Sequence, residues 1–255
     1  MLGCMLSNME DYKFKTKPYQ HQDDILKGTW DKINWAFFME MGTGKSKVCI
    51  DTAAMLFEAG EIDTFIVVAP KGVYRNWANL EIPAHMPDRV REGALISMWR
   101  PNPPKALKQD LNSFTEPAQG FRMLMINIEA LSTAKGQKYL AAVLGASEAL
   151  LAIDESTAIK SVKASRTKSL LKMSHLAKYR RILTGFPVTQ SPLDLWSQCR
   201  FMGKNLLGDC GDNFFQFQYR YAIMNRRNVG AHSFNQIVGY RNLDELSGLL
   251  KNFSS

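Results

Sequence analysis

The sequence predicts an α/β fold in which helices flank a mostly parallel central sheet. Strand-like and helix-like segments alternate along the 255 residues, as in proteins with parallel sheets. Several strand-like segments are apolar throughout, which is typical of strands that helices cover on both faces. A glycine-rich turn at Gly42 and Gly44 lies between a predicted strand and a predicted helix. Phosphate-binding loops occur between such elements.

The first half of the chain supplies most of this pattern. An apolar strand over 35–39 runs into the glycine-rich turn, and a helix over 45–57 follows it. The next strand, 64–69, is rich in β-branched residues and stops at Pro70. The predicted elements after it are a helix over 73–80, a strand over 94–99 and a Pro-rich loop over 100–105.

The second half repeats the alternation. Apolar segments predict three more strands, and a helix is predicted between the first two: strands 122–128, 149–153 and 180–184, helix 139–144. From about residue 193 the pattern becomes helical and aromatic. The aromatic cluster over 214–221 is expected to pack the C-terminal helices, and a base-stacking platform is the alternative.

Composition excludes several classes of protein. Hydrophobic residues make up 45% and charged residues 22%, so a disordered or low-complexity chain is not expected. No apolar run approaches the roughly 20 residues of a membrane helix, so no membrane partner is expected. The four cysteines (Cys4, Cys49, Cys199 and Cys210) lack the spacing of a zinc site. We therefore expect a reducing, cytoplasmic location, which is the host cytoplasm for a viral protein.

The charge of the chain points to an anionic partner. The net charge is +8, and the stretch from Lys160 to Arg181 holds eight Lys or Arg residues and no acidic one. A localised positive stretch is the footprint that a phosphate backbone requires, so a nucleic-acid-binding face is predicted here.

The glycine-rich turn has the residues of a phosphate-binding loop. Glycines allow a tight turn whose N–H groups point inward, and the start of the next helix adds a partial positive charge. Lys45 is placed to reach the β- and γ-phosphates and Ser46 to ligate Mg²⁺. The strict pattern requires glycine at position 39, where this chain has Met39. The alternative is a chance Gly-Lys-Ser turn.

An acidic pair follows a second apolar strand. Asp154 and Glu155 come directly after 149–153, at the strand end where α/β proteins bind their ligands. Asp154 is predicted to hold Mg²⁺, and Glu155 to act as general base on the attacking water. The alternative is an acidic pair that only caps the next loop.

Together these motifs resemble the first RecA-like lobe of a superfamily 2 helicase, in the Swi/Snf-type translocase branch or its phage relatives. In this branch position 39 is usually a small residue other than glycine. The resemblance extends from about Pro18 to Asp244. Six ordered motifs carry it: Pro-Tyr-Gln at 18–20, Glu-Met-Gly-Thr-Gly-Lys-Ser at 40–46, Ala-Pro-Lys at 69–71 with Asn-Trp at 76–77, Asn-Ile-Glu-Ala-Leu at 127–131, Asp-Glu-Ser-Thr-Ala-Ile-Lys at 154–160 and Leu-Thr-Gly-Phe-Pro at 183–187.

The resemblance implies that ATP and Mg²⁺ bind and that hydrolysis drives movement along nucleic acid, with DNA as the expected partner. It assigns roles by position: Tyr19 and Gln20 to the adenine; Gly42, Thr43, Gly44, Lys45 and Ser46 to the phosphates and Mg²⁺; Asp154 and Glu155 to the metal and the water; Thr184 and Gly185 to coupling; Pro70, Lys71 and Asn127 to the nucleic-acid strand. Two departures put the coupling in doubt. Ser156-Thr157 stands where many relatives have Ala-His or Gly-His, and Phe186 stands where they have Thr.

Such motors have two lobes, and the second supplies arginine fingers. The residues after Gln190 are too few for a second lobe, so we expect one lobe over 18–255, preceded by an extension over 1–17. A second lobe would act in cis or in trans, and the isolated chain would hydrolyse ATP slowly or not at all. The alternatives are a non-motor nucleotide- or nucleic-acid-binding module, and the motor part of a restriction or defence system. The motifs favour a bacterial or viral origin.

Overall fold

The computed structural model describes residues 9–229 and 232–255. Its centre is a six-stranded sheet in the order β1-β6-β5-β2-β4-β3. Every neighbouring pair in this sheet is parallel, which confirms the predicted fold class. The strands are β1 (Asn34–Phe38), β2 (Thr64–Ala69), β3 (Leu95–Met98), β4 (Arg122–Asn127), β5 (Ala149–Asp154) and β6 (Tyr179–Thr184).

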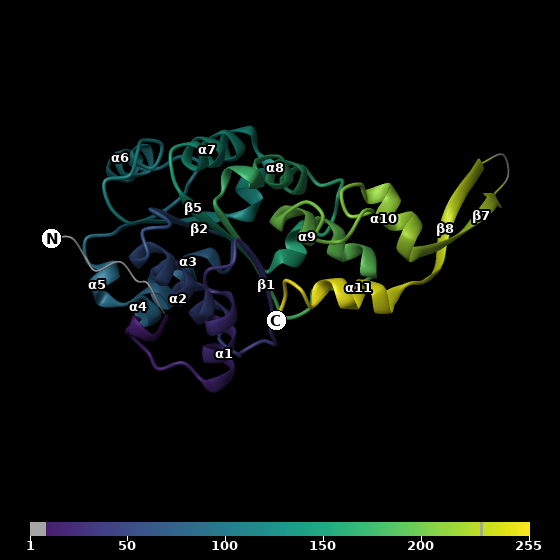
Figure 1. Ribbon diagram of the computed structural model, residues 1–255. Helices are drawn as coiled ribbons and strands as arrows, with labels where there is room; N and C mark the ends of the chain where they lie inside the picture. Colours follow the sequence, from purple (N-terminus) through teal and green to yellow (C-terminus); the bar gives the residue numbers. More distant parts are fainter. Residues whose placement is uncertain (1–8, 230–231) are drawn as a thin grey trace.

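Helices cover both faces of the sheet (Figure 1). On one face lie α1 (Gln20–Thr29), α2 (Lys45–Glu58), α3 (Tyr74–Asn76), a π-helical segment (Trp77–Glu81), α4 (Ile82–His85) and α5 (Asp88–Arg91). On the other lie α6 (Lys105–Ser113), α7 (Ala134–Gly145), α8 (Ser165–Met173) and α9 (Leu195–Met202). Successive strand residues therefore join opposite cores. Ile66 packs with the α7 side and Val67 with the α2 side, which explains why β2 is apolar throughout.

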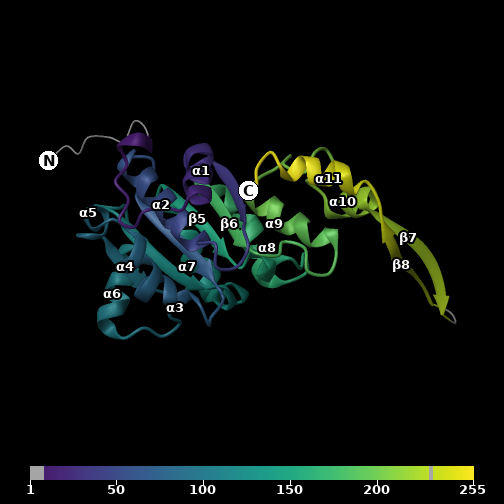
Figure 2. The same cartoon turned by 90° about the horizontal axis from the view of Figure 1, so that it is seen from below.

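The C-terminal part corrects one prediction. The helical pattern expected from residue 193 is confirmed for α9, α10 (Phe214–Tyr221) and α11 (Leu243–Leu250). It is wrong between α10 and α11, where β7 (Ala222–Val229) and β8 (His232–Tyr240) form an antiparallel hairpin. Polar and apolar side chains are mixed in these strands without a strict alternation, so they lack the pattern that marks a half-buried strand. Figures 1 and 2 show the hairpin extending away from the sheet.

The end of the chain returns to the sheet. The backbone N–H of Ala36 in β1 donates to the carbonyl of Phe253 at 2.8 Å, and Ser255 donates back to the carbonyl of Ala36 at 3.1 Å. This short parallel pairing covers the side of β1 that β6 does not occupy.

Within residues 9–229 and 232–255, none of the helices is long and apolar enough to cross a membrane. Cys49, Cys199 and Cys210 are free thiols, whereas Cys4 lies outside the described residues.

Candidate nucleotide-binding site

Three of the predicted motifs meet at one edge of the sheet. The glycine-rich loop follows β1, the Thr184-Gly185 segment ends β6, and the acidic pair ends β5. These three strands are neighbours and parallel, so their carboxyl ends lie side by side. This edge is where open α/β sheets bind ligands.

The glycine-rich loop has the backbone of an anion-binding turn. Gly42 and Gly44 have φ angles of 80° and 85°, in the left-handed region that favours glycine. A Cβ atom on Gly44 would lie 2.2 Å from Nε2 of Gln22, so a larger residue does not fit there. The loop leads into α2, whose first N–H groups and helix dipole face the space a phosphate would occupy.

Lys45 lies over this loop. Its Nζ donates to the carbonyls of Met39 at 3.0 Å and Glu40 at 2.9 Å. Its positive charge also opposes the rise that burial causes in the pKa values of Asp154 and Glu155. Ser46 is the next residue, in the first turn of α2, where its hydroxyl can reach the same space.

Asp154 is held by two hydrogen bonds. Its Oδ2 accepts from Nε1 of Trp77 at 2.8 Å, and its Oδ1 accepts from the backbone N–H of Glu155 at 3.0 Å. Burial raises the pKa of Asp154, although these two bonds and the charge of Lys45 oppose the rise. A partly buried carboxylate whose charge is disfavoured by burial is well suited to receive a divalent metal ion, which would stabilise that charge.

Glu155 has an unusual backbone. Its φ is 50°, a left-handed conformation that costs a non-glycine residue free energy and turns the chain sharply after β5. Burial, and next the charge of Asp154, raise the pKa of Glu155, while Lys45 and a hydrogen bond with Thr184 lower it. A raised pKa brings a carboxylate closer to the range of a general base.

The structure places Tyr19 and Gln20, the two residues predicted to contact the adenine, at the surface. Tyr19 is 72% exposed and stacks on His21, and Gln20 is exposed with its amide bonded to Asp24 at 2.8 Å. Tyr19 and Gln20 line a hollow of about 720 Å³. The amide that contacts the phosphate loop belongs to Gln22, whose Nε2 donates to the carbonyl of Thr43 at 2.8 Å.

Gln22 is a site residue that the sequence analysis missed. It is 2% exposed and lies one helical turn before the buried Leu26, on the inward face of α1. The signal available in the sequence was this i, i+4 relation to an apolar residue. It shows that a polar side chain faces the core and therefore needs a partner there.

The predicted coupling residues lie between the loop and the acidic pair. Thr184 is buried, and its hydroxyl accepts from the backbone N–H of Phe186 at 3.2 Å. A Cβ on Gly185 would meet Cγ of Met41 at 3.4 Å, so this segment lies in close contact with the phosphate loop.

A hydrogen-bonded bridge begins at Ser156, next to Thr157, which stands at the position of the family histidine. The hydroxyl of Ser156, directly after the acidic pair, donates to Oε1 of Gln198 at 2.7 Å. Nε2 of Gln198 donates to the carbonyl of Pro187 at 2.8 Å. Ser156 and Gln198 are both fully buried, so this bridge ties the turn after β5 to the loop after β6 through α9.

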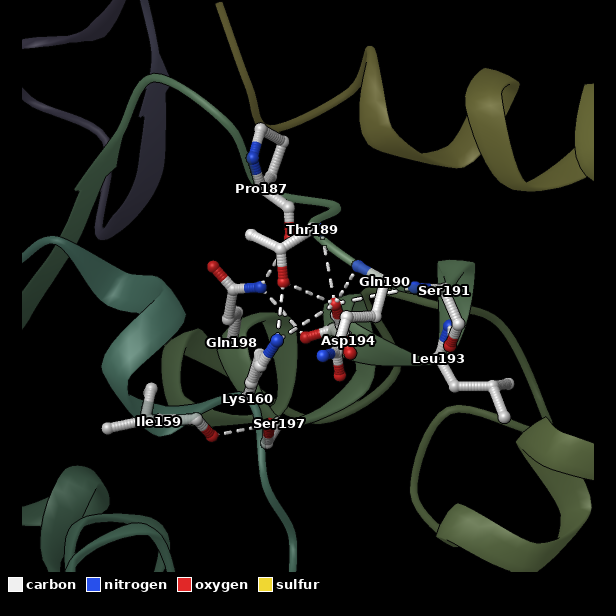
Figure 3. A network of polar contacts seen from close by, with 10 residues as sticks. All are labelled: Ile159, Lys160, Pro187, Thr189, Gln190, Ser191, Leu193, Asp194, Ser197 and Gln198. Atoms are coloured by element: carbon white, nitrogen blue, oxygen red, sulfur yellow. Dashed lines mark hydrogen bonds and ion pairs between the residues drawn. The ribbon is translucent and has the colours of Figure 1, made fainter.

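The same loop is fixed from its other side (Figure 3). Oδ2 of Asp194 accepts from the backbone N–H groups of Thr189 at 3.1 Å and Gln190 at 2.9 Å, and from the Thr189 hydroxyl at 2.8 Å. Lys160 donates to the Thr189 hydroxyl at 2.5 Å. These bonds lower the pKa of Asp194 against the opposing effect of burial, so its charge is stable at neutral pH.

The predicted nucleic-acid residues lie at the ends of β2 and β4. Lys71 and Asn127 line one hollow of about 450 Å³, together with Arg75 and Arg100. Oδ1 of Asn127 accepts from the backbone N–H of Ala130 at 2.9 Å, so its carbonyl oxygen shapes the following turn. The carbonyl of Pro70 accepts from Val73 and Tyr74 and thereby starts α3. Arg75 and Arg100 were not predicted, because their proximity depends on strand order.

The basic stretch from Lys160 to Arg181 does not form one face. Arg181 is fully buried, and its guanidinium donates to the carbonyls of Thr29 and Trp30, both at 3.1 Å. Lys178 forms an ion pair with Glu61 at 3.0 Å. The prediction of a phosphate-binding surface is therefore wrong for this end of the stretch, because a count of charges does not register burial.

The aromatic cluster over 214–221 is divided between two environments. Phe217 and Tyr221 are fully buried in the core, as the packing interpretation expected. Phe215 and Tyr219 are 76% and 70% exposed on the opposite side of α10.

The fold and the site define a RecA-like P-loop lobe: a parallel sheet, a glycine loop before a helix, and an acidic pair on a nearby strand. The chain belongs to the SNF2-related domain family, whose family model matches residues 12–251. This confirms the Swi/Snf-type resemblance.

Known proteins support this assignment. The chain is 29% identical over 230 residues to the chromatin-remodeling ATPase INO80 of Arabidopsis thaliana. It is 25% identical over 248 residues to the protein CHROMATIN REMODELING 24 of the same plant. The SWI2/SNF2 ATPase core of Sulfolobus solfataricus, solved in complex with dsDNA, matches its fold with a TM-score of 0.67 at 18% identity.

The matches cover most of this chain but only part of each relative. They span 87% of the chain and 14% of INO80, and 94% of the chain and 22% of CHROMATIN REMODELING 24. The match to the Sulfolobus core covers 96% of the chain and 45% of that core.

Proposed function

We propose that the chain is the ATP-binding N-terminal lobe of an ATP-dependent DNA translocase. The observation that carries the proposal is that the phosphate loop with Lys45 follows β1 and the pair Asp154-Glu155 ends β5, with only β6 between these two parallel strands. This is the set of groups that phosphoryl transfer requires: a cation for the phosphates, a carboxylate for the metal ion and a base for the water.

ATP and Mg²⁺ fit the residues present. Gly42 and Gly44 give the loop its left-handed backbone, and the following helix end favours an anion. The hydroxyl of Ser46 and the carboxylate of Asp154 are oxygen donors of the kind Mg²⁺ prefers. The ion would neutralise phosphate charge, while Glu155 would hold and deprotonate the attacking water.

We further propose that a second lobe covers this edge. Several large apolar side chains around the site are exposed: Met41 at 74%, Phe186 at 64% and Val188 at 43%. They follow the phosphate loop and the Thr184-Gly185 segment, and exposed apolar groups that cluster at one edge favour a protein interface. The isolated chain is then an incomplete ATPase, because groups that stabilise the transition state come from the second lobe.

We propose that DNA is the nucleic acid along which the protein moves. The Sulfolobus core was solved with dsDNA, and the hollow that contains Lys71, Arg75 and Arg100 offers three cationic side chains at the carboxyl edge. Pro70 and Asn127 would shape the loops that present them. Binding at this hollow should be sequence-independent and salt-sensitive, because phosphate contacts dominate it.

Nucleotide binding tests the proposal directly. The affinity of the chain for a fluorescent ATP analogue is measured with and without Mg²⁺, for the parent and for Lys45→Ala. A loss of tenfold or more is expected, and Lys32→Ala, at an exposed position before β1, is the matched control. Equal affinity of Lys45→Ala and the parent would contradict the assignment.

The rate of ATP hydrolysis distinguishes an isolated lobe from a complete two-lobe motor. ATP turnover by this chain alone should stay low and respond little to duplex DNA. Rapid, DNA-stimulated turnover by the chain alone would overturn the need for a second lobe. The bacterial or viral origin stays a prediction, and the two relatives compared above by sequence are both from a plant.

A further inference from the structure

The hairpin β7–β8 is anchored only at its base. Ala222, Ile237 and Tyr240 pack against the core, whereas residues 223–228 and 233–236 are exposed. Both views show the hairpin extending beyond α10 and α11, far from the nucleotide site (Figures 1 and 2). An isolated two-stranded ribbon is marginally stable by itself, so an arm of this length is expected to serve contact with a partner.

The charge around the arm has one sign. From Asn213 to Leu243 the sequence contains four arginines and no Asp or Glu. Two of the four are already engaged at the base: Arg220 pairs with Glu245 at 2.5 Å, and Arg241 donates to the carbonyls of Tyr219 and Arg220. The other two, Arg226 and Arg227, lie on the exposed part of the arm.

These two arginines have only neutral partners among the described residues. Arg226 donates to the Ser233 hydroxyl at 3.1 Å, and Arg227 donates to Oε1 of Gln236 at 3.2 Å. Neither takes part in an ion pair of the described part of the chain, so both positive charges are available to a ligand.

The strand register distributes the arginines over both faces. Arg226 lies opposite Asn235, and Arg227 lies opposite Phe234. Because successive strand residues point to opposite faces, each face of the arm carries one guanidinium. Amide side chains accompany them along the arm: Asn225, Asn228, Asn235 and Gln236.

We propose that the β7–β8 arm binds the backbone and groove of duplex nucleic acid, at a surface separate from the hollow beside Lys71. A two-stranded ribbon fits a major groove of about 12 Å, and Arg, Asn, Gln and Ser are the side chains that contact phosphates and base edges. The arm also exposes Ile223, Met224, Phe234 and Val238, and apolar side chains contact thymine methyl groups or insert between base steps of duplex DNA. The proposal does not rest on the ATP site, and no nucleotide is needed for this contact.

The test uses the full chain and a labelled 30-base-pair duplex of mixed sequence, without nucleotide. Binding is followed by fluorescence anisotropy from 50 to 200 mM salt. Each lost phosphate contact lowers the slope of log affinity against log salt by about 0.9, so Arg226→Gln/Arg227→Gln should lower it by about 1.8. The affinity at 100 mM salt should fall about tenfold or more.

Two matched variants interpret the result. Lys13→Gln/Lys32→Gln removes the same charge from exposed positions outside the arm and should leave the slope unchanged. Arg226→Lys/Arg227→Lys keeps both positive charges and should retain most of the parent's slope of log affinity against log salt. An unchanged slope in the glutamine arm variant, an equal fall in the control pair, or no duplex binding by the parent overturns the proposal. ATP-analogue binding on the same samples reports separately on Lys45.

Discussion

Trp77 holds one oxygen of Asp154 through a 2.8 Å hydrogen bond from its indole Nε1. The indole is 1% exposed and comes from the segment after β2, whereas Asp154 ends the neighbouring strand β5. The segment beside the proposed DNA hollow therefore positions the carboxylate beside the proposed metal site. A change on one side can reach the other through a single contact.

Trp77→Phe tests this contact. Phenylalanine keeps an aromatic ring but removes the donor, so the carboxylate loses a charge-assisted bond and its pKa should rise further. We expect a loss of about 1–3 kcal/mol in the free energy of unfolding, measured by urea titration, and weaker Mg²⁺-dependent ATP binding.

Trp35→Phe is the matched control for this change. Its Nε1 donates to the Ser255 hydroxyl at 3.3 Å in an exposed position, so its effect should stay within about 0.5 kcal/mol. Equal losses for the two variants would mean that the bond to Asp154 has no special role.

The raised pKa of Asp154 predicts a pH-dependent stability. A carboxyl group whose pKa is higher in the folded state stabilises the fold fully below its unfolded value. This contribution is lost as the pH rises through the folded value. Asp154→Asn cannot ionise, so its gain in unfolding free energy over the parent should be larger at pH 8 than at pH 4.5.

Asp88→Asn should change the pH dependence of the unfolding free energy in the opposite direction. Lys15 and Arg91 hold the pKa of Asp88 below its ordinary value, so this variant should lose stability relative to the parent as the pH rises. Denaturant curves at several pH values measure both. If the parent were more stable than Asp154→Asn at pH 8, burial of the Asp154 carboxylate would not destabilise the fold.

Gly44 tests the shape of the phosphate loop. Gly44→Ala places a Cβ 2.2 Å from Gln22 and puts alanine at a φ of 85°. A left-handed conformation costs alanine roughly 1–2 kcal/mol, and the contact adds to this. Thermal unfolding should show the loss, and ATP-analogue affinity should fall about tenfold.

A helical glycine provides the comparison. Gly28→Ala, near the end of α1, meets nothing within 4 Å and should stabilise the chain by about 0.5–1 kcal/mol. If both substitutions had the same sign, the loop conformation would not be the cause.

The bridge from Ser156 through Gln198 predicts a coupled pair. Ser156→Ala leaves Oε1 of Gln198 buried without its donor and should cost about 1–3 kcal/mol. The double variant with Gln198→Leu should cost less than the sum of the single changes, by about 0.5–3 kcal/mol.

Ser169 is a suitable reference for this cycle. Its buried hydroxyl has no hydrogen-bond partner in the structure, so Ser169→Ala should be neutral or stabilising. Additive costs for Ser156 and Gln198 would show that the bridge does not connect the two loops energetically.

The sequence predicted what depends on local pattern. The bounds of β2 agree with the structure because a β-branched run ends at Pro70. The helix after the glycine loop and the acidic strand end were also predicted within one residue. These motifs meet at one edge because each follows a strand of the central sheet, whose six strands are parallel.

What the sequence did not predict depends on contacts between distant segments. The arm β7–β8 exists through pairing of two strands of mixed polar and apolar residues, and neither strand is recognisable by itself. Gln22 faces the phosphate loop because α1 packs there, although Gln20 carries the family pattern. Arg181 counts as a surface charge in the sequence, yet it serves as a buried donor to the end of α1.

The return of residues 253–255 to β1 has a consequence for solubility. β1 lies at the border of the sheet, and a free border strand can pair with another molecule. The bonds between Ala36 and residues Phe253 and Ser255 occupy this border next to the phosphate loop. Residues 253–255 therefore block the pairing of β1 with another molecule, and so oppose edge-to-edge aggregation at the strand that leads into the phosphate loop.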